Sequence, residues 1–321
     1  MPNLKELPIE SSVSTKRRKS LRIIIPFLSL LVVLGLFTIL APTKFPTLKN
    51  IILILQQSAV TMTIGFGMTF VIVAGSIDLS VGSVVALSGM IGASIATSHG
   101  GWLGFLSAIL VGLSCGLVNG SAFAFLRIPS FIVTLGMLQM ARGFTIIYSH
   151  GFPIMMPKNV LWIGNWPGIF IVTMIAFVLA SILFYFSKFG EYIRAIGGDE
   201  NVARMSGVPV RKYKVFAFLT SGGLAGLGGF MMAARLGVAS PTIGVGYELD
   251  VIASVVLGGT PLTGGTGQVY GTIIGAITMA AIGNGLVILG VPSEWQLVVK
   301  GVILILAVFV SLEREKIGVI K

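Results

Sequence analysis

Few residues of this 321-residue chain could carry catalysis or bind a metal. The two histidines, His99 and His150, and the single cysteine, Cys115, form no pattern that would hold zinc or haem. The stretch Gly112-Leu-Ser-Cys-Gly116 matches the G-x-S-x-G pattern of a serine nucleophile. That pattern requires a strand-to-helix turn, whereas here it lies in an apolar run without a placed base. The chain also has no phosphate-binding loop of the form G-x-x-x-x-G-K-[ST]. We therefore expect no catalytic residue, no metal site and no ATP hydrolysis by this chain.

One acidic residue, Asp78, stands between two apolar runs in the stretch Ala74-Gly-Ser-Ile-Asp-Leu-Ser-Val-Gly-Ser83. An ionisable residue near membrane depth is a candidate for function. Asp78 could also be the N-cap of the helix that follows, with Ser80 nearby, and a cap does not exclude a place beside a pathway. The cap is the favoured interpretation.

A second stretch, Leu257-Gly-Gly-Thr-Pro-Leu-Thr-Gly-Gly-Thr266, partly repeats this pattern. Such a partial repeat of sequence is consistent with an internal structural repeat of the kind that transporters use. The candidates for a translocation pathway or a helix break are Asp78, Ser80, Thr260 and Thr263.

The composition of the chain indicates the class of protein in which these residues lie. Apolar residues make up 55% of the chain and charged residues only 10%, with a mean hydropathy of +0.98. A soluble domain carries about 25% charged residues, and disordered chains are polar and highly charged. The composition therefore excludes a soluble enzyme and a disordered chain, and it predicts an all-α membrane protein with many spans.

A transmembrane helix needs about 20 mostly apolar residues. A run at 23–41 is too long for a signal peptide and lacks a cleavage site, so we interpret it as an uncleaved anchor. The segment 250–267 begins with a short apolar run and continues with glycines and a proline, which predicts a broken or partly re-entrant span. The sequence thus predicts about ten segments. The other runs are 50–74, 81–97, 102–126, 131–149, 167–187, 213–236, 268–290 and 296–312.

Lysine and arginine collect on one side of this ten-segment arrangement, which predicts that both termini are cytoplasmic. The four tryptophans fall at the opposite helix ends, as expected of an interfacial belt. We predict a basic cytoplasmic segment at 1–22, a membrane domain at 23–312 and a cytoplasmic tail at 313–321. Glycines at a spacing of four predict close helix packing. They are Gly112, Gly116 and Gly120, Gly222 and Gly226, and Gly271 and Gly275.

The longest cytoplasmic connection spans 188–214 and contains a short predicted helix. Asp199 is a suitable N-cap for a helix over Asp199–Met205, Gly207 can terminate it, and Pro209 blocks its continuation. A short exposed helix could dock on another protein, or the connection could be a solvated loop that only fixes topology. The residues alone favour the solvated loop.

Three stretches resemble the signatures of one family. Gly75-Ser-Ile-Asp-Leu-Ser-Val-Gly-Ser83 resembles the GGIDLSVGS signature of bacterial simple-sugar ABC importer permeases of the ribose type. The stretches from Ala195 to Gly207 and from Gly246 to Thr260 are similar to that family's cytoplasmic coupling loop and third signature. Ser76 replaces a glycine of the first signature, and Asp199 replaces the usual asparagine. The likeness extends from about Ile51 to Val310.

The resemblance implies a permease in the bacterial inner membrane that moves a monosaccharide, such as ribose, by alternating access. Its implied partners are an ABC ATPase subunit that binds ATP and magnesium, a periplasmic or lipid-anchored sugar-binding protein, and a second permease copy or a sister permease. No cofactor is implied for this chain. Implied receptor contacts are Glu248 and Asp250. The implied ATPase-coupling residues are Gly197, Gly198, Asp199, Asn201, Ala203, Arg204 and Gly207. The alternative is a secondary transporter of a small neutral solute that is driven by an ion gradient, with Asp78 as its ion site.

Overall fold

The chain folds into long apolar helices, because a backbone within lipid must form its hydrogen bonds internally. The computed structural model describes residues 10–311. The long helices are α1 (Glu10–Leu40), α2 (Leu48–Val73), α3 (Val81–His99), α4 (Gly101–Phe125), α5 (Ser130–Ser149), α6 (Gly168–Tyr185), α9 (Val210–Leu236), α11 (Val269–Ile288) and α12 (Ser293–Ser311). The short elements are β1 (Ile154–Met155), η1 (Lys158–Gly164), α7 (Lys188–Gly198), α8 (Glu200–Met205), β2 (Val238–Ala239) and α10 (Tyr247–Leu257).

Seven of the described helices, α2 to α6, α9 and α11, are long and apolar enough to cross a membrane. Each of these helices contains an apolar stretch of 18 residues that could cross the membrane. In α5 only 22% of that stretch is buried within the protein, whereas in α3 72% of it is buried. The exposed remainder of α5 is an apolar surface suited to lipid or to another membrane protein. The chain is therefore an all-α membrane protein with multiple spans, as the composition predicts.

The first helix, α1, begins at Glu10 and therefore runs through part of the basic segment predicted at 1–22. The division of the chain at residue 22 stays a prediction. Residues 1–9 and the predicted tail at 313–321 lie outside the described residues.

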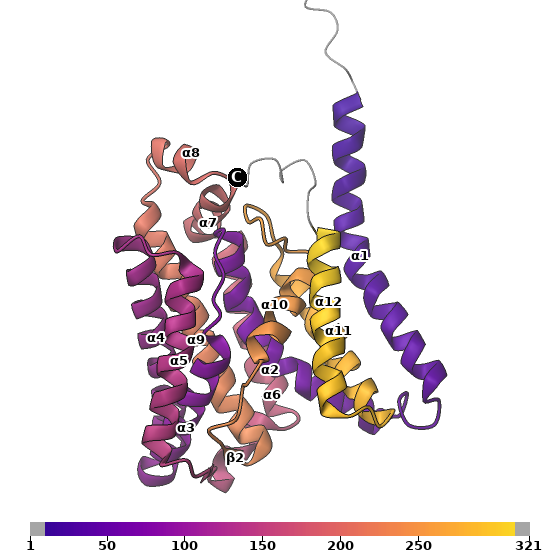
Figure 1. The fold of residues 1–321 in the computed structure, drawn as a ribbon, viewed down its shortest axis with the longest axis vertical. Coiled ribbons are helices and arrows are strands. Elements are labelled where there is room, and N and C mark those ends of the chain that lie inside the picture. Colours follow the sequence, from indigo (N-terminus) through magenta and orange to yellow (C-terminus); the bar gives the residue numbers. More distant parts are fainter. Residues whose placement is uncertain (1–9, 312–321) are drawn as a thin grey trace, which may run out of the picture.

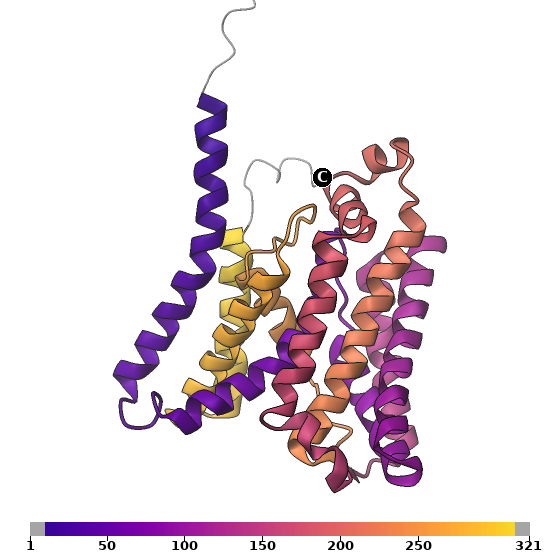
Figure 2. The ribbon, with the colours of Figure 1, turned by 180° about the vertical axis from the view of Figure 1, so that it is seen from behind.

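The two ends of the bundle carry different elements (Figures 1 and 2). α7 and α8 lie at the top of Figure 1, near the connection between α10 and α11, and β2 lies at the opposite end. There β2 pairs antiparallel with β1, with Ile154 opposite Ala239. After α2 the chain runs back into the bundle before α3 begins, so Asp78 lies within the bundle rather than on a loop outside it.

α4 and α9 pack backbone to backbone through their glycines. A β-carbon added at Gly112 would overlap the carbonyl oxygen of Gly222 and lie 2.8 Å from the Cα of Gly226. The predicted helix packing is therefore confirmed for this pair. Ser114 donates a hydrogen bond of 2.8 Å to the carbonyl of Leu110 in its own helix, so no nucleophile elbow is present.

Gly112→Ala is expected to destabilise the protein by roughly 1–3 kcal/mol, because the added methyl meets backbone that cannot rotate aside. Alanine is otherwise the better helix former by about 1 kcal/mol. The matched control is Gly143→Ala on α5, where an added β-carbon meets nothing within 4 Å. Thermal unfolding of both purified variants in detergent measures the difference. A midpoint for Gly112→Ala equal to that of the control would contradict the packing argument.

α10 is the short helix at the start of the segment predicted to be a broken span. It has 11 residues, about 16 Å of helix at 1.5 Å per residue, which is about half of a 30 Å hydrocarbon core. Nonhelical segments precede and follow it, and Gly271 and Gly275 of α11 pack directly on the backbone of Gly258 and Ser254. The prediction of a break in 250–267 is confirmed.

Candidate functional site

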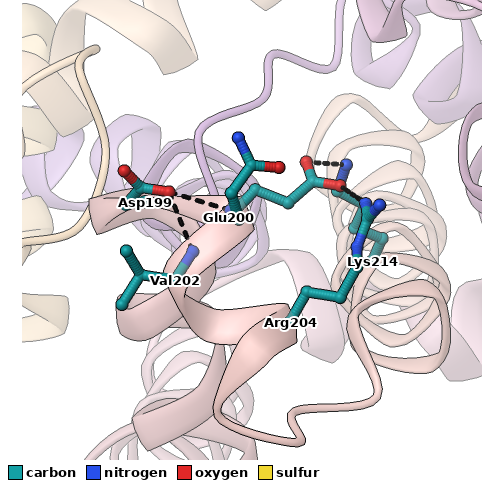
Figure 3. Close-up of polar contacts among 6 residues, drawn as sticks. Asp199, Glu200, Val202, Arg204 and Lys214 are labelled. Carbon is teal, nitrogen blue, oxygen red and sulfur yellow. Dashed lines mark hydrogen bonds and ion pairs between the residues drawn. The ribbon is translucent and has the colours of Figure 1, made fainter.

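α8 is the short capped helix that the sequence predicts. The Asp199 carboxylate accepts hydrogen bonds of 2.8 and 3.0 Å from the backbone N–H groups of Asn201 and Val202, as Figure 3 shows. Gly207 has a positive φ of 82° just after the helix, and Pro209 is the N-cap of α9. These local signals determine both ends of α8.

Glu200 ties α8 to its neighbours (Figure 3). Its carboxylate pairs with Arg204 at 2.6 Å within α8 and with Lys214 of α9 at 2.5 Å. The Lys214 ammonium also lies 4.3 Å from the centre of the Phe123 ring of α4. Partial burial opposes ionisation of Glu200, but Lys214 and Arg204 outweigh it and lower the pKa of the carboxyl. α8 is therefore held on α9 as a defined unit.

α8 has a buried face and an exposed face. Ala203 is buried and packs with Ile196 and Val210. On the exposed face, Val202 is 54% and Met205 is 81% solvent-exposed. Exposed apolar side chains on a fixed helix at one end of the molecule suit a groove in a partner protein.

A cluster of glycines joins α7 to two other segments. We call Gly75, Gly197, Gly198, Gly264 and Gly265 the glycine junction. The Gly265 N–H donates to the carbonyl of Val73 at 2.9 Å. A β-carbon at Gly197 would overlap that same carbonyl oxygen and lie 2.5 Å from the Gly265 nitrogen.

The other contacts of the glycine junction are equally close. A β-carbon at Gly264 would lie 2.9 Å from the Cα of Gly75, and one at Gly265 would lie 2.9 Å from the Cα of Gly198. At Gly197, Gly264 and Gly265, only a glycine allows this approach. The resemblance singled out Gly197 and Gly198, but nothing in the sequence placed them against Gly75 and Gly264.

The two segments that contact α7 follow α2 and α10, and these two helices end in the same way. After α2, the N–H of Gly75 donates to Ile72 and that of Ser76 donates to Val71. After α10, Gly259 donates to Val256 and Thr260 donates to Val255 in the same pattern. Both are Schellman motifs, with φ of 76° at Gly75 and 88° at Gly259. This shared geometry agrees with the partial repeat that was predicted between the two stretches.

The prediction that Asp78 caps the third span is wrong. Ser80 occupies the N-cap position of α3, and its side chain makes no capping bond. Asp78 instead accepts hydrogen bonds from the Ser80 N–H and hydroxyl at 3.0 and 2.6 Å, and from the Ser221 hydroxyl of α9 at 3.0 Å. Asn119 of α4 donates to the Ser80 hydroxyl at 2.9 Å. Asp78 thus joins three helices in a buried cluster.

The other two pathway candidates make no hydrogen bond to that cluster within the described residues. Thr260 is buried, and its hydroxyl accepts from the N–H of Gln268 at 3.1 Å, which holds the loop before α11. Thr263 is half-buried in the same loop.

The two residues implied as receptor contacts lie in the first turn of α10, in the half of the bundle opposite α8. Asp250 pairs with Lys300 of α12 at 2.6 Å. Glu248 is half-buried beside Gly82 of α3. Their contact with a receptor stays a prediction. Between residues 10 and 311, no group of three or more His, Cys, Asp or Glu side chains could hold a metal ion.

Comparison with known proteins connects this arrangement to transport. The family described as "Branched-chain amino acid transport system / permease component" matches residues 50–308. The ribose import permease protein RbsC of Escherichia coli (strain K12) is 40% identical over 300 residues, covering 90% of this chain and 93% of the relative.

Two further relatives are similar over a comparable length. RbsC of Bacillus subtilis (strain 168) is 40% identical over 303 residues, covering 91% and 92% of the two chains. The D-allose transport system permease protein AlsC of Escherichia coli (strain K12) is 37% identical over 294 residues, covering 88% and 89%. No solved structure matches the chain significantly.

Proposed function

Since the chain belongs to the family of transport-system permease components that matches residues 50–308, we propose that it is the permease subunit of an ATP-driven monosaccharide importer. The observation that carries this proposal is the 40% identity to a ribose import permease over 90% of the chain. The names of other relatives include allose, arabinose and xylose, so the proposed substrate class is an aldose. Ribose is the first candidate.

The proposed topology has ten crossings of the bacterial inner membrane, with both termini and the connection at 188–214 in the cytoplasm. α1, α10 with its flanking segments, and α12 supply the crossings beyond the seven long apolar helices. Trp102, Trp162, Trp166 and Trp295 lie at or near the ends of elements that face away from α8, and each is more than half exposed. Amphipathic tryptophans at the outer interface support this orientation.

In the proposed mechanism, an ABC ATPase subunit binds and hydrolyses ATP with magnesium, and it docks on α8. Movement of α8 then carries α7, because α8 follows α7 directly. The glycine junction passes that movement to the end of α2 and to the loop before α11 without intervening side chains that could absorb it. Alternating access follows, with a second permease copy completing the pathway and a sugar-binding protein supplying the solute.

Uptake by the reconstituted transporter tests this function. Proteoliposomes containing the chain, its ATPase and its receptor are expected to accumulate ribose, allose, arabinose or xylose only when ATP is present. Omitting either partner should remove uptake. Gradient-driven uptake by the chain alone, or ATP-dependent transport of none of the four sugars, would refute the proposal.

Met205→Ala is expected to reduce the amount of ATPase that copurifies with the permease several-fold, because Met205 is the most exposed apolar side chain of α8. Met155→Ala is the matched control, since Met155 is 71% exposed at the opposite end of the bundle. Copurification of a tagged permease from membranes measures the effect. Equal recovery of ATPase with both variants would show that α8 is not the docking element.

A further inference from the structure

A polar cavity lies in the half of the bundle opposite α8. It has a volume of about 170 Å³ and is lined by residues of α2, α9, α10, α11 and α12. Its polar lining consists of Gln57, Thr61, Arg235, Tyr247, Asp250 and Lys300. Val60, Met232 and Met279 supply an apolar wall. Ionisable groups inside a membrane bundle are costly, so their presence calls for a function.

We propose that this cavity is a transient binding site for one neutral, polyhydroxylated solute molecule of monosaccharide size on its way through the permease. The inference rests on the proposed function and adds to it a location and a set of contacts. It also gives Asp250 a role inside the protein, in addition to the predicted contact with a receptor.

Two pairs of polar groups are arranged on the cavity wall. The Thr61 and Tyr247 hydroxyls, from α2 and α10, lie 2.6 Å apart. The Asp250 carboxylate and the Lys300 ammonium, from α10 and α12, also lie 2.6 Å apart. Each pair satisfies part of its own hydrogen-bonding capacity, and both pairs join α10 to a neighbouring helix at the cavity wall.

Arg235, at the end of α9, lines the cavity. Its Nε atom is buried and has no hydrogen-bond partner. A buried donor without a partner is costly, and a ligand acceptor that reached it would remove that cost. Arg235 is therefore the group that a ligand oxygen would satisfy.

The lining matches hydroxyl groups better than anions or apolar groups. It offers donors in Arg235 and Lys300, acceptors in Asp250, and groups that do both in Gln57, Thr61 and Tyr247. A site for an anion would consist mainly of donors, and the Asp250 carboxylate would repel the ligand. Sugar hydroxyls donate and accept at once, and the C–H face of a sugar can pack against the methionines.

Cysteine protection provides the direct test, because the chain has one native cysteine, which is buried. Gln57→Cys is made in a Cys115→Ala background, in the complete transporter in proteoliposomes. A small water-soluble thiol reagent should label it, and the best-transported of the four aldoses at millimolar concentration should slow labelling at least threefold. The control, Ser98→Cys at the exposed end of α3, should be labelled at the same rate with and without sugar.

The outcomes separate this inference from the proposed function. If none of the four aldoses is transported, the proposed function fails. If an aldose is transported but Gln57→Cys is unlabelled or unprotected, or if inorganic phosphate protects it as well as the sugar, the cavity proposal is overturned.

A transport measurement provides an independent check. Arg235→Gln should lower uptake at least tenfold per assembled transporter, with assembly measured as copurified ATPase, and Arg235→Lys should restore part of the rate. The control is Lys49→Gln, an exposed cation in the first turn of α2 that lies outside the cavity. Wild-type uptake by Arg235→Gln would contradict the proposed contact.

Discussion

Gly197→Ala is expected to lower sugar uptake by the assembled transporter at least tenfold while its ATPase partner continues to hydrolyse ATP. The added methyl would overlap the carbonyl oxygen of Val73 and lie 2.5 Å from the nitrogen of Gly265. Both neighbours are backbone atoms, so no rotation of a side chain can relieve the clash. α7 must then move away from α2 and from the loop before α11, and the route by which ATPase movement reaches these segments is broken.

A glycine outside the glycine junction provides the control. A β-carbon at Gly143 of α5 meets nothing within 4 Å, and its φ is not positive. Gly143→Ala therefore leaves the contacts of the glycine junction unchanged and should retain most of the uptake. The measurement is the ratio of sugar transported to ATP hydrolysed in proteoliposomes. A normal ratio for Gly197→Ala, or an equal loss in both variants, would show that close backbone approach at Gly197 does not couple the two activities.

Short-range features of the fold could be predicted from the sequence. α8 depends on Asp199, Gly207 and Pro209, which lie within a few residues of its ends. The spans depend on long apolar runs, and apart from the start of α1 the long helices begin and end within a few residues of them. Glycine spacing also predicted the packing of α4 on α9, because it specifies which side of each helix allows close approach.

Contacts between distant segments could not be predicted in this way. The glycine junction brings together segments near residues 75, 197 and 264, and no property of any one segment indicates the other two. The Asp250–Lys300 pair was missed for the same reason, since Asp250 was predicted only as a receptor contact. Periodicity specifies which face of a helix is polar, but not which helix that face meets.

Asp78 illustrates how a local rule can give the wrong partner. An aspartate shortly before a helix is a suitable cap, and that alone motivated the capping prediction. The helix begins one residue after Ser80, however, so the Asp78 carboxylate is two residues from the cap position. It is free to bond with Ser221, 143 residues away, and this long-range contact defines its place in the structure.

Asp78→Ala is therefore expected to destabilise the protein by roughly 3 kcal/mol or more. The change leaves the Ser80 N–H, the Ser80 hydroxyl and the Ser221 hydroxyl without their acceptor, in an interior where water is scarce. Each buried polar group left without a partner costs about 1–3 kcal/mol. Asp78→Asn keeps one carbonyl acceptor in the same place and should lose less.

Ser221→Ala provides the comparison that separates the cluster from a general packing defect. It removes a single donor and leaves the two bonds from Ser80 in place, so a loss of about 1 kcal/mol is expected. The double variant should then be no more than slightly less stable than Asp78→Ala alone, because the Ser221 hydroxyl has already lost its acceptor. Thermal unfolding of the three variants in detergent measures this coupling. Strictly additive losses would mean that Asp78 and Ser221 act independently, and that the carboxylate does not hold α9 to the start of α3.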